Sequence, residues 1–253
     1  MIYDLQKASM WKRISALLFD AILLGIVAVM FAWGLSSALG YDRHSQTLDA
    51  CYARYAEEYG VNFSMSLTEY EAMTPEEAAH LQAPYDALSA DEEAVYAYGM
   101  MMQLTILITS LCLLLAFLAL EFFIPLALGN GQTLGKKIFG LGVMRTDGVR
   151  VGGVCMFIRT ILGKYTIETM IPVLILLMLY FGTIGLTGTL VLLAIAVLQI
   201  GLMIGTKTNS PIHDLLATTV EVDIGSQMIF KSTEDMIAYK EKLHAEKAAK
   251  QPY

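Results

Sequence analysis

Long apolar stretches dominate the hydropathy pattern of this chain, and charged residues are almost absent from them. From Ile14 to Leu39 the only charged side chain is Asp20, and from Gly99 to Leu128 it is Glu121. No charged residue at all lies between Thr169 and Thr206. A helix in water needs a polar outer face, whereas a helix in lipid can be apolar on every side. The pattern therefore predicts membrane-spanning helices.

The lengths of these stretches predict four spans. A spanning helix needs roughly 20 apolar residues. The uncharged run 169–206 would form a helix about 57 Å long at about 1.5 Å per residue, and the hydrocarbon core is only about 30 Å thick. The run must therefore fold back, and the glycines and threonines of 182–188 are the only plausible turn. The predicted spans are 14–39, 99–128, 165–183 and 187–206.

Composition agrees with a lipid-embedded chain. Hydrophobic residues make up 56% of the sequence and charged residues only 16%, against about 25% charged residues in a typical globular domain. We expect the lipid bilayer to be the main partner and expect no nucleic-acid partner. The three cysteines are scattered along the chain, which predicts neither a disulfide framework nor a zinc site. The first span is too long for a cleaved signal peptide, so we expect it in the mature protein.

The distribution of basic residues predicts the orientation. Lys7, Lys12 and Arg13 precede the first span, and the loop 129–164 carries six basic residues against Asp147 alone. The segment 41–98 has two basic and twelve acidic residues. Basic segments stay on the cytoplasmic side. Both termini and the middle loop are therefore predicted to be cytoplasmic, and 41–98 to lie outside.

The acidic segment 41–98 reads as a helical insert. Residues 44–59 are followed by Gly60, a typical helix stop. Two capping-box signatures occur at 66–69 and 74–77, and a third at 89–92 predicts the start of a long helix that enters the second span. The insert divides a transmembrane domain formed by 1–40 and 99–224, and an amphipathic cytoplasmic tail follows at 225–253. The acidic surplus of the insert could concentrate cations or simply be a solvated face.

Short elements are predicted on the inner side. Asp147-Gly148 between apolar residues predicts a β-hairpin of 142–146 with 149–151, and 218–222 offers a third strand. Residues 154–162 predict a separate interfacial helix, and a short helix follows at 211–216. The fold class is therefore an all-α integral membrane protein with four transmembrane helices, an extracytoplasmic helical insert and a small cytoplasmic β-hairpin or short sheet.

Sequence motifs argue against catalysis. Residues 129–137 (GNGQTLGKK) resemble a phosphate-binding loop, but the required glycine and the Ser or Thr after Gly-Lys are replaced by Asn130 and Lys137. We therefore reject nucleotide binding and expect the glycines to end the second span. No catalytic triad or metal-binding His cluster is convincing. We expect a non-enzyme without cofactor or metal.

The candidate site residues are Arg13, Asp20, Glu121 and Asp214. A spacing of seven residues turns a helix by about 700°, which places Arg13 and Asp20 on one stripe about 10 Å apart. Asp214 is at a suitable depth to pair with Arg13, and Glu121 at a depth similar to that of Asp20. Facing carboxylates could share a proton or bind a cation. Alternatively, the charges form a structural clamp that fixes helix packing. Both interpretations stay open.

Three segments together resemble the RDD family of bacterial membrane proteins. They are KRISALLFDAILL in the first span, GNGQTLGKKIFGLGVMRTDG after the second, and PIHDLLATTVEVD after the last. The family is named after one Arg and two Asp, which match Arg13, Asp20 and Asp214. The resemblance covers about 10–40 and 100–223 and implies a location in the bacterial cytoplasmic membrane.

The resemblance leaves the activity open. At least one family member has been proposed to exchange sodium for protons, and eukaryotic relatives of the domain are accessory factors in membrane protein quality control. The first hypothesis is therefore that Asp20, helped by Glu121, binds Na⁺ or H⁺ for transport, with a homo-oligomer enclosing the path. The second is a membrane adaptor or assembly factor with a membrane-protein partner. A lipid-headgroup sensor that uses Lys136, Lys137 and Arg159 ranks last.

Overall fold

The computed structural model describes residues 7–250, which divide into two compact units. The first unit combines the chain up to Val29 with the chain from Cys112 onward, and the second comprises Met30–Leu111. We call them the core unit and the insert unit and describe each by itself. The boundary falls inside two long helices, so the insert unit takes in more of the chain than the predicted insert 41–98.

Four helical segments of the described chain are long and apolar enough to cross a membrane, which confirms the predicted number. They are Met10–Leu39, Glu92–Leu128, Gly153–Tyr180 and Leu186–Gly205. Large apolar side chains point outward along them, for example Trp33 with 79% exposure. Such exposure would be costly in water but is expected where acyl chains surround a helix.

Two of these helices contain π-helical segments, in which the backbone bonds to the fifth residue instead of the fourth. The second helix consists of α5 (Glu92–Phe117), η1 (Leu118–Phe123) and α6 (Ile124–Leu128). The third consists of α8 (Gly153–Phe157), η2 (Ile158–Met170) and α9 (Ile171–Tyr180). Proline is the second residue of both α6 and α9. A proline ring crowds the carbonyl of the preceding turn, and in both helices the wider turn lies directly before it.

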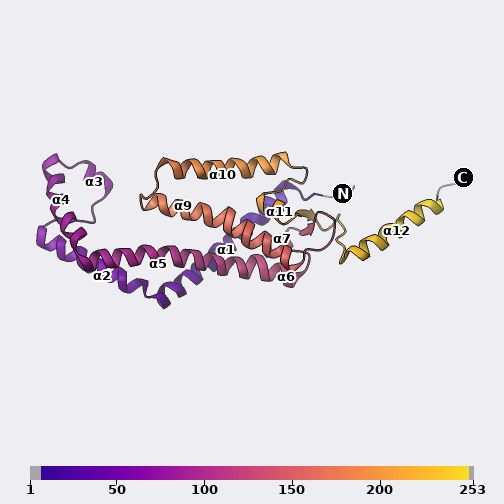
Figure 1. The fold of residues 1–253 in the computed structure, drawn as a ribbon, viewed down its shortest axis with the longest axis horizontal. Coiled ribbons are helices and arrows are strands. Elements are labelled where there is room, and N and C mark those ends of the chain that lie inside the picture. Colours follow the sequence, from indigo (N-terminus) through magenta and orange to yellow (C-terminus); the bar gives the residue numbers. More distant parts are fainter. Residues whose placement is uncertain (1–6, 251–253) are drawn as a thin grey trace. The chain divides into compact units, whose positions relative to one another are not determined.

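The third helix corrects one prediction. Residues 154–162 do not form a separate interfacial helix, because the helix that begins at Gly153 continues without a break to Tyr180. The span therefore begins well before the predicted residue 165 and includes three charged side chains. The chain then turns at Gly182, whose φ of 67° favours glycine, and returns as α10 (Leu186–Gly205). Figure 1 shows α9 and α10 lying antiparallel, side by side.

A two-stranded antiparallel sheet joins distant parts of the core unit. β1 (Leu141–Arg145) pairs with β2 (Thr219–Asp223), with Val143 opposite Glu221. The predicted hairpin is only partly correct, because Val149 and Arg150 form isolated bridges and 149–151 is not a strand. The predicted third strand is instead the main partner. The short helices α7 (Leu134–Ile138) and α11 (Ile212–Leu216) precede β1 and β2.

The first part of α1 (Met10–Leu39) also belongs to the core unit, as does α12 (Thr233–Lys250). The start of α7 lies close to α1 at Gly135. A Cβ added at Gly135 would lie 2.5 Å from the backbone oxygen of Ala16. Only glycine permits so close an approach, and it brings the loop after α6 into contact with the charged stripe of α1.

The insert unit is helical, as predicted. It contains α2 (Tyr41–Tyr59), α3 (Leu67–Glu71), α4 (Pro75–Ala90) and the beginning of α5. Gly60 ends α2 in the left-handed region, and both predicted capping boxes, at Ser66 and Thr74, are formed. The third predicted capping box, at 89–92, names the wrong capping residue. Asp91 rather than Ser89 caps α5, because its carboxylate accepts from the backbone N–H groups of residues 93 and 94.

Candidate functional site

Arg13 on α1 is buried and forms three polar contacts within the core unit. Its Nε donates to Glu221 Oε2 at 2.8 Å, and one terminal nitrogen donates to the backbone oxygen of Asn209 at 2.8 Å. The other terminal nitrogen lies 3.8 Å from Asp214 Oδ2. The predicted pair of Arg13 with Asp214 therefore exists, but Glu221, which sequence reasoning missed, is the closer partner.

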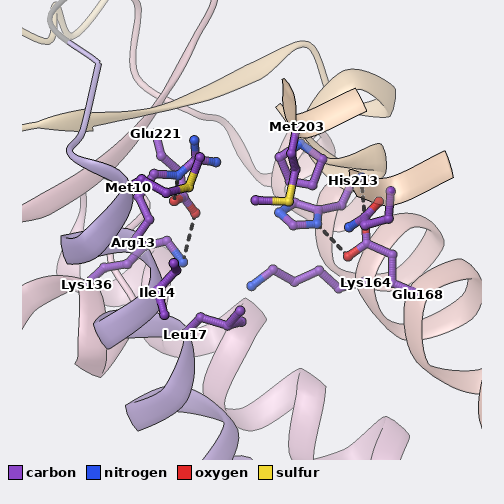
Figure 2. A pocket seen from close by; sticks show the side chains of 12 residues that line it. Met10, Arg13, Ile14, Leu17, Lys136, Lys164, Glu168, Met203, His213 and Glu221 are labelled. Carbon is purple, nitrogen blue, oxygen red and sulfur yellow. Dashed lines mark hydrogen bonds and ion pairs between the residues drawn. The ribbon is translucent and has the colours of Figure 1, made fainter. Parts of the chain in front are cut away.

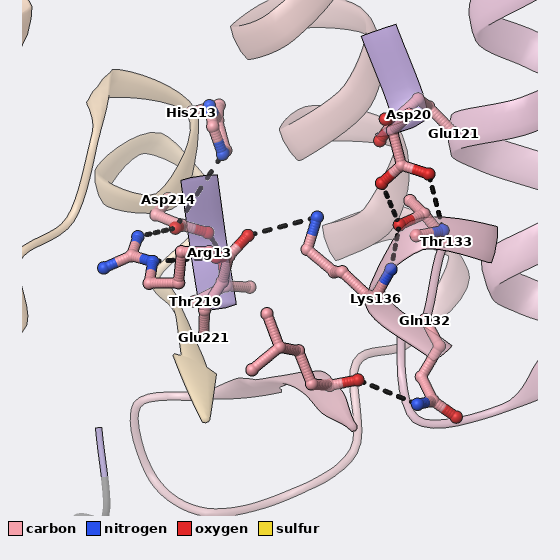
Figure 3. Close-up of polar contacts among 12 residues, drawn as sticks. Arg13, Asp20, Glu121, Gln132, Thr133, Lys136, His213, Asp214, Thr219 and Glu221 are labelled. Atoms are coloured by element: carbon pink, nitrogen blue, oxygen red, sulfur yellow. Dashed lines mark hydrogen bonds and ion pairs between the residues drawn. The ribbon is translucent and has the colours of Figure 1, made fainter. Parts of the chain in front are cut away.

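Glu221 is the centre of a cluster of cations. Besides Arg13, its carboxylate contacts Arg159 at 3.1 Å and Lys136 at 3.2 Å; Figure 3 shows the contact with Lys136. Burial alone would raise the pKa of Glu221, but the charges of Lys136, Arg159 and Arg13 hold that pKa well below its usual range. Glu221 is therefore ionised and bound from three sides.

Asp214 on α11 completes this cluster. Its Oδ1 accepts from Arg159 Nε at 2.8 Å and from Thr219 Oγ1 at 2.7 Å. Its Oδ2 has no hydrogen-bond partner among the described residues, although Arg13 and His213 each lie 3.8 Å away. We call Arg13, Arg159, Asp214 and Glu221, with Lys136, the clamp. It joins α1, α7, η2, α11 and β2.

Asp20, the second predicted carboxylate, anchors the start of α7. Its Oδ1 accepts from the backbone N–H of Gly135 at 2.7 Å, and its Oδ2 accepts from the Thr133 hydroxyl. Thr133 in turn caps α7 by accepting from the backbone N–H of Lys136. Figure 3 shows this chain of contacts. A carboxylate near the first N–H groups of a helix is favourable, so Asp20 has a clear positioning role.

Glu121, the fourth predicted residue, is paired with a lysine that sequence reasoning missed. Lys164 Nζ lies 2.5 Å from Glu121 Oε2, and both side chains are buried. Thr160 ties the same two helices together, because its hydroxyl donates to the backbone oxygen of Glu121 at 2.9 Å. Among the described residues Asp20 and Glu121 thus have different partners, since Asp20 contacts Thr133 and Gly135 whereas Glu121 contacts Lys164.

A second missed pair is Glu168 with His213. His213 Nδ1 lies 2.7 Å from Glu168 Oε2, and the His213 backbone N–H donates to Glu168 Oε1 at 2.9 Å. Arg159 donates to His213 Nε2 at 3.1 Å, and arginine has no acceptor. Nε2 must therefore be the acceptor, and Nδ1 carries the proton that Glu168 accepts. Burial, and then the charge of Arg159, lower the pKa of His213, which agrees with a neutral ring.

The π-helical geometry of η2 explains why these residues meet. Arg159, Lys164 and Glu168 are separated by five and four residues. In an α-helix of about 3.6 residues per turn, Arg159 and Glu168 would lie on opposite sides. Since a π-helix bonds to the fifth residue, its turn holds more than four residues, and the three side chains share one face. In the sequence, the one signal for this face was that the three charged residues directly precede the uncharged run 169–206.

Two cavities border this face. The first, of about 120 Å³, is lined by Arg13, Lys136, Glu221 and apolar side chains of α1 and α10; Figure 2 shows its labelled lining residues. The second, of about 250 Å³, is lined by Asp20, by Glu121, by apolar side chains of α1 and by Phe117 at the end of α5. Lys164, Glu168 and His213 line both cavities, so they stand in the wall between them.

The charged core carries one more negative than positive side chain. With His213 neutral, four cations face five carboxylates among the described residues of the cluster: Arg13, Lys136, Arg159 and Lys164 against Asp20, Glu121, Glu168, Asp214 and Glu221. Each buried charge is costly unless it is compensated. The surplus therefore leaves room for one proton or one monovalent cation.

Within residues 7–250, two groups of side chains have metal-ligand spacing, but their carboxylates already contact other residues. The ligand atoms of His213, Asp214 and Glu221 lie within 4.8 Å of one another. Arg13 and Arg159 contact these same carboxylates, so the positive charge is supplied by the protein.

The second group lies in the insert unit and consists of Cys51, Asp91 and Glu93. Asp91 there pairs with Arg54 and caps α5. Its oxygens are therefore already engaged. Cys51, Cys112 and Cys155 are not joined in disulfide bonds.

Comparison with known proteins supports the resemblance seen in the sequence. The RDD family model matches residues 7–218. Arg13, Asp20 and Asp214, the three residues that carry the resemblance, all lie in the matched range. No curated protein and no solved structure matched the chain.

Proposed function

The chain belongs to the RDD family of membrane proteins, and from that premise we propose that it binds and exchanges monovalent cations, Na⁺ against H⁺, at the buried carboxylates of the core unit. The supporting observation is the cavity of about 250 Å³ between candidate spans, which Asp20, Glu121 and Lys164 line together. Ionisable groups at membrane depth are rare and usually belong to ion or proton pathways. The role is binding and transfer rather than catalysis.

Glu121 is the residue we assign to cation binding. Its carboxylate lines the cavity and, within the described part of the chain, forms an ion pair with Lys164 alone. Carboxylate oxygens suit hard cations. Asp20 lines the same cavity, but both of its oxygens hold the start of α7. We therefore shift the main role from Asp20 to Glu121 and give Asp20 the role of positioning the cavity wall.

Orientation follows from the positive-inside rule. The basic segments around Lys12 and Lys136 support a cytoplasmic position of both termini and of the sheet, and the acidic insert supports an outer position of 41–98. We propose the bacterial cytoplasmic membrane as the location. Four spans form a small transporter, so we further propose that a homo-oligomer encloses the complete path.

The test is a flux measurement in liposomes that contain the purified protein and a trapped pH dye. A Na⁺ gradient is expected to change the internal pH, and Glu121→Gln is expected to abolish that change. Glu57→Gln, at an exposed position of the insert unit, is the matched control and is expected to retain it. An intact protein without any Na⁺-dependent pH change would refute the proposal.

A second candidate function is a membrane adaptor or assembly factor with a membrane-protein partner. The observation in its favour is that Arg13, Asp20 and Asp214 all make internal contacts. In that case Asp20→Asn lowers stability by about 1.5–3 kcal/mol, since a charged hydrogen-bond acceptor is lost, and crosslinking in membranes finds a defined partner. Unchanged stability together with lost flux would exclude this alternative.

A further inference from the structure

Lys164 stands in the wall between the two cavities of the core unit. Its side chain lines both of them, whereas Glu121 lines only the larger cavity and Glu221 only the smaller one. In Figure 2 the Lys164 side chain enters from the side of Glu168 and His213, and its nitrogen points across the smaller cavity toward Arg13. Its ammonium group contacts Glu121 Oε2. Lys164 thus pairs with the carboxylate of the larger cavity and also borders the smaller cavity.

We propose that Lys164 is a tethered cation that neutralises Glu121 when no Na⁺ is bound and withdraws toward the smaller cavity when Na⁺ binds Glu121. The inference rests on the proposed function, because it names the group with which Na⁺ competes. Lysine suits this exchange, since its ammonium is a compact charge on a flexible four-carbon stem.

The smaller cavity can receive the displaced ammonium. Glu221 lines it but is already paired with Arg13, Lys136 and Arg159. Glu168 also lines it and accepts hydrogen bonds from the neutral His213, so Glu168 is the carboxylate that takes up the ammonium. A buried ammonium without a partner would be strongly unfavourable, so a second acceptor is a condition for displacement. Glu121 likewise needs a cation at all times, either the lysine or the ion. Binding of Na⁺ then neutralises the one surplus negative charge of the cluster, because the displaced Lys164 remains within it.

Lys136 offers a matched comparison, because it is a buried lysine with a different environment. Its Nζ lies 3.2 Å from Glu221, and Arg13 and Arg159 hold the same carboxylate. Removing Lys136 leaves Glu221 with two cationic partners. Removing Lys164 leaves Glu121 without its ion-pair partner, free for Na⁺. The two variants change the charge equally but open a cation site in one case only.

The experiment measures the melting temperature of the full-length protein in detergent while NaCl replaces choline chloride at constant ionic strength. Lys164→Gln is expected to melt lower than the wild type without Na⁺ and to recover as Na⁺ is added. Its half-maximal stabilisation is expected at a Na⁺ concentration about tenfold below that of the wild type, which corresponds to about 1.4 kcal/mol. Lys136→Gln is expected to keep the wild-type midpoint.

Lys164→Arg provides a second variant that retains the charge if Lys164→Gln fails to fold. A guanidinium holds a carboxylate with two parallel hydrogen bonds, so Na⁺ should compete less well and the midpoint should rise. An unchanged midpoint in Lys164→Arg, or equal midpoints in Lys164→Gln and Lys136→Gln, would overturn the inference.

The outcomes separate the inference from the function on which it rests. If the wild type exchanges Na⁺ for H⁺ in liposomes but Lys164→Gln responds to Na⁺ as Lys136→Gln does, only the role of Lys164 is refuted. If the wild type shows no flux and no variant responds to Na⁺, the proposed function is refuted and the inference with it.

Discussion

The clamp and the Glu121–Lys164 pair are both buried ionic contacts, yet they are built differently. In the clamp, Glu221 has three cationic partners and Arg159 contacts both Asp214 and Glu221. Glu121 and Lys164 form a single ion pair beside a cavity. Shared partners fix a geometry, because no one group can leave without several others. A single pair beside open space can be exchanged.

The largest expected effect is on the clamp. Arg159→Met removes the closest cationic partner of Asp214, which then has only Arg13 at 3.8 Å among the described residues, and it removes one of the three cationic partners of Glu221. We expect a loss of about 3–5 kcal/mol in the free energy of unfolding, measured as a lower melting temperature and yield. Arg145→Met removes an exposed ion pair with Asp147 and should cost about 0–1 kcal/mol. Equal effects of the two substitutions would mean that the clamp is not structural.

A smaller effect is expected where η2 packs on α11. A Cβ at Gly163 would lie 2.5 Å from the Cβ of His213, whereas one at Gly153 would meet nothing within 4 Å. Gly163→Ala should therefore destabilise the protein by about 1–3 kcal/mol. It should also disturb the ion pair of Lys164 with Glu121 and the contact of Glu168 with His213. Gly153→Ala is the control and should be tolerated. Thermal unfolding of both variants gives the comparison, and a tolerated Gly163→Ala would contradict the close packing.

The smallest expected effect is on pH dependence and concerns His213, which contacts the clamp through Arg159 and the cavity wall through Glu168. Its pKa is lowered in the folded state by burial and by Arg159. The unfolded chain therefore binds a proton first, and stability falls as the pH drops below about 6.5 toward the folded pKa. His213→Asn should flatten this part of the profile of melting temperature against pH. The same slope in both proteins would show that other groups cause it.

Much of the fold could be predicted from the sequence because lipid imposes a simple rule on it. Charge-free stretches fixed the number of spans, and local capping signals gave the insert helices with Gly60 as a stop. The site was harder. Arg13, Asp20, Glu121 and Asp214 are all buried, but three of their main partners, Lys164, Arg159 and Glu221, were not identified as such.

Two physical reasons explain these omissions. Arg159 and Lys164 lie on one face only because η2 is π-helical, and periodicity arguments assume about 3.6 residues per turn. The strand that carries Glu221 was predicted at 218–222 and does pair with β1, but a strand pattern does not specify which residues of other elements a side chain contacts. A lone charge between Val220 and Val222 in an apolar strand was the available signal.

The proposed exchange of Lys164 for Na⁺ at Glu121 is tested most directly by removing the charges of both residues together. The double variant Glu121→Gln with Lys164→Gln removes one charge of each sign, so the net charge of the cluster is unchanged and the protein should fold with a melting temperature close to that of the wild type. The measurement is the Na⁺-driven pH change in liposomes that contain this variant. We predict that the pH change is absent although the protein is folded and inserted. A pH change of wild-type size would contradict the account, because cation exchange would then proceed without Glu121.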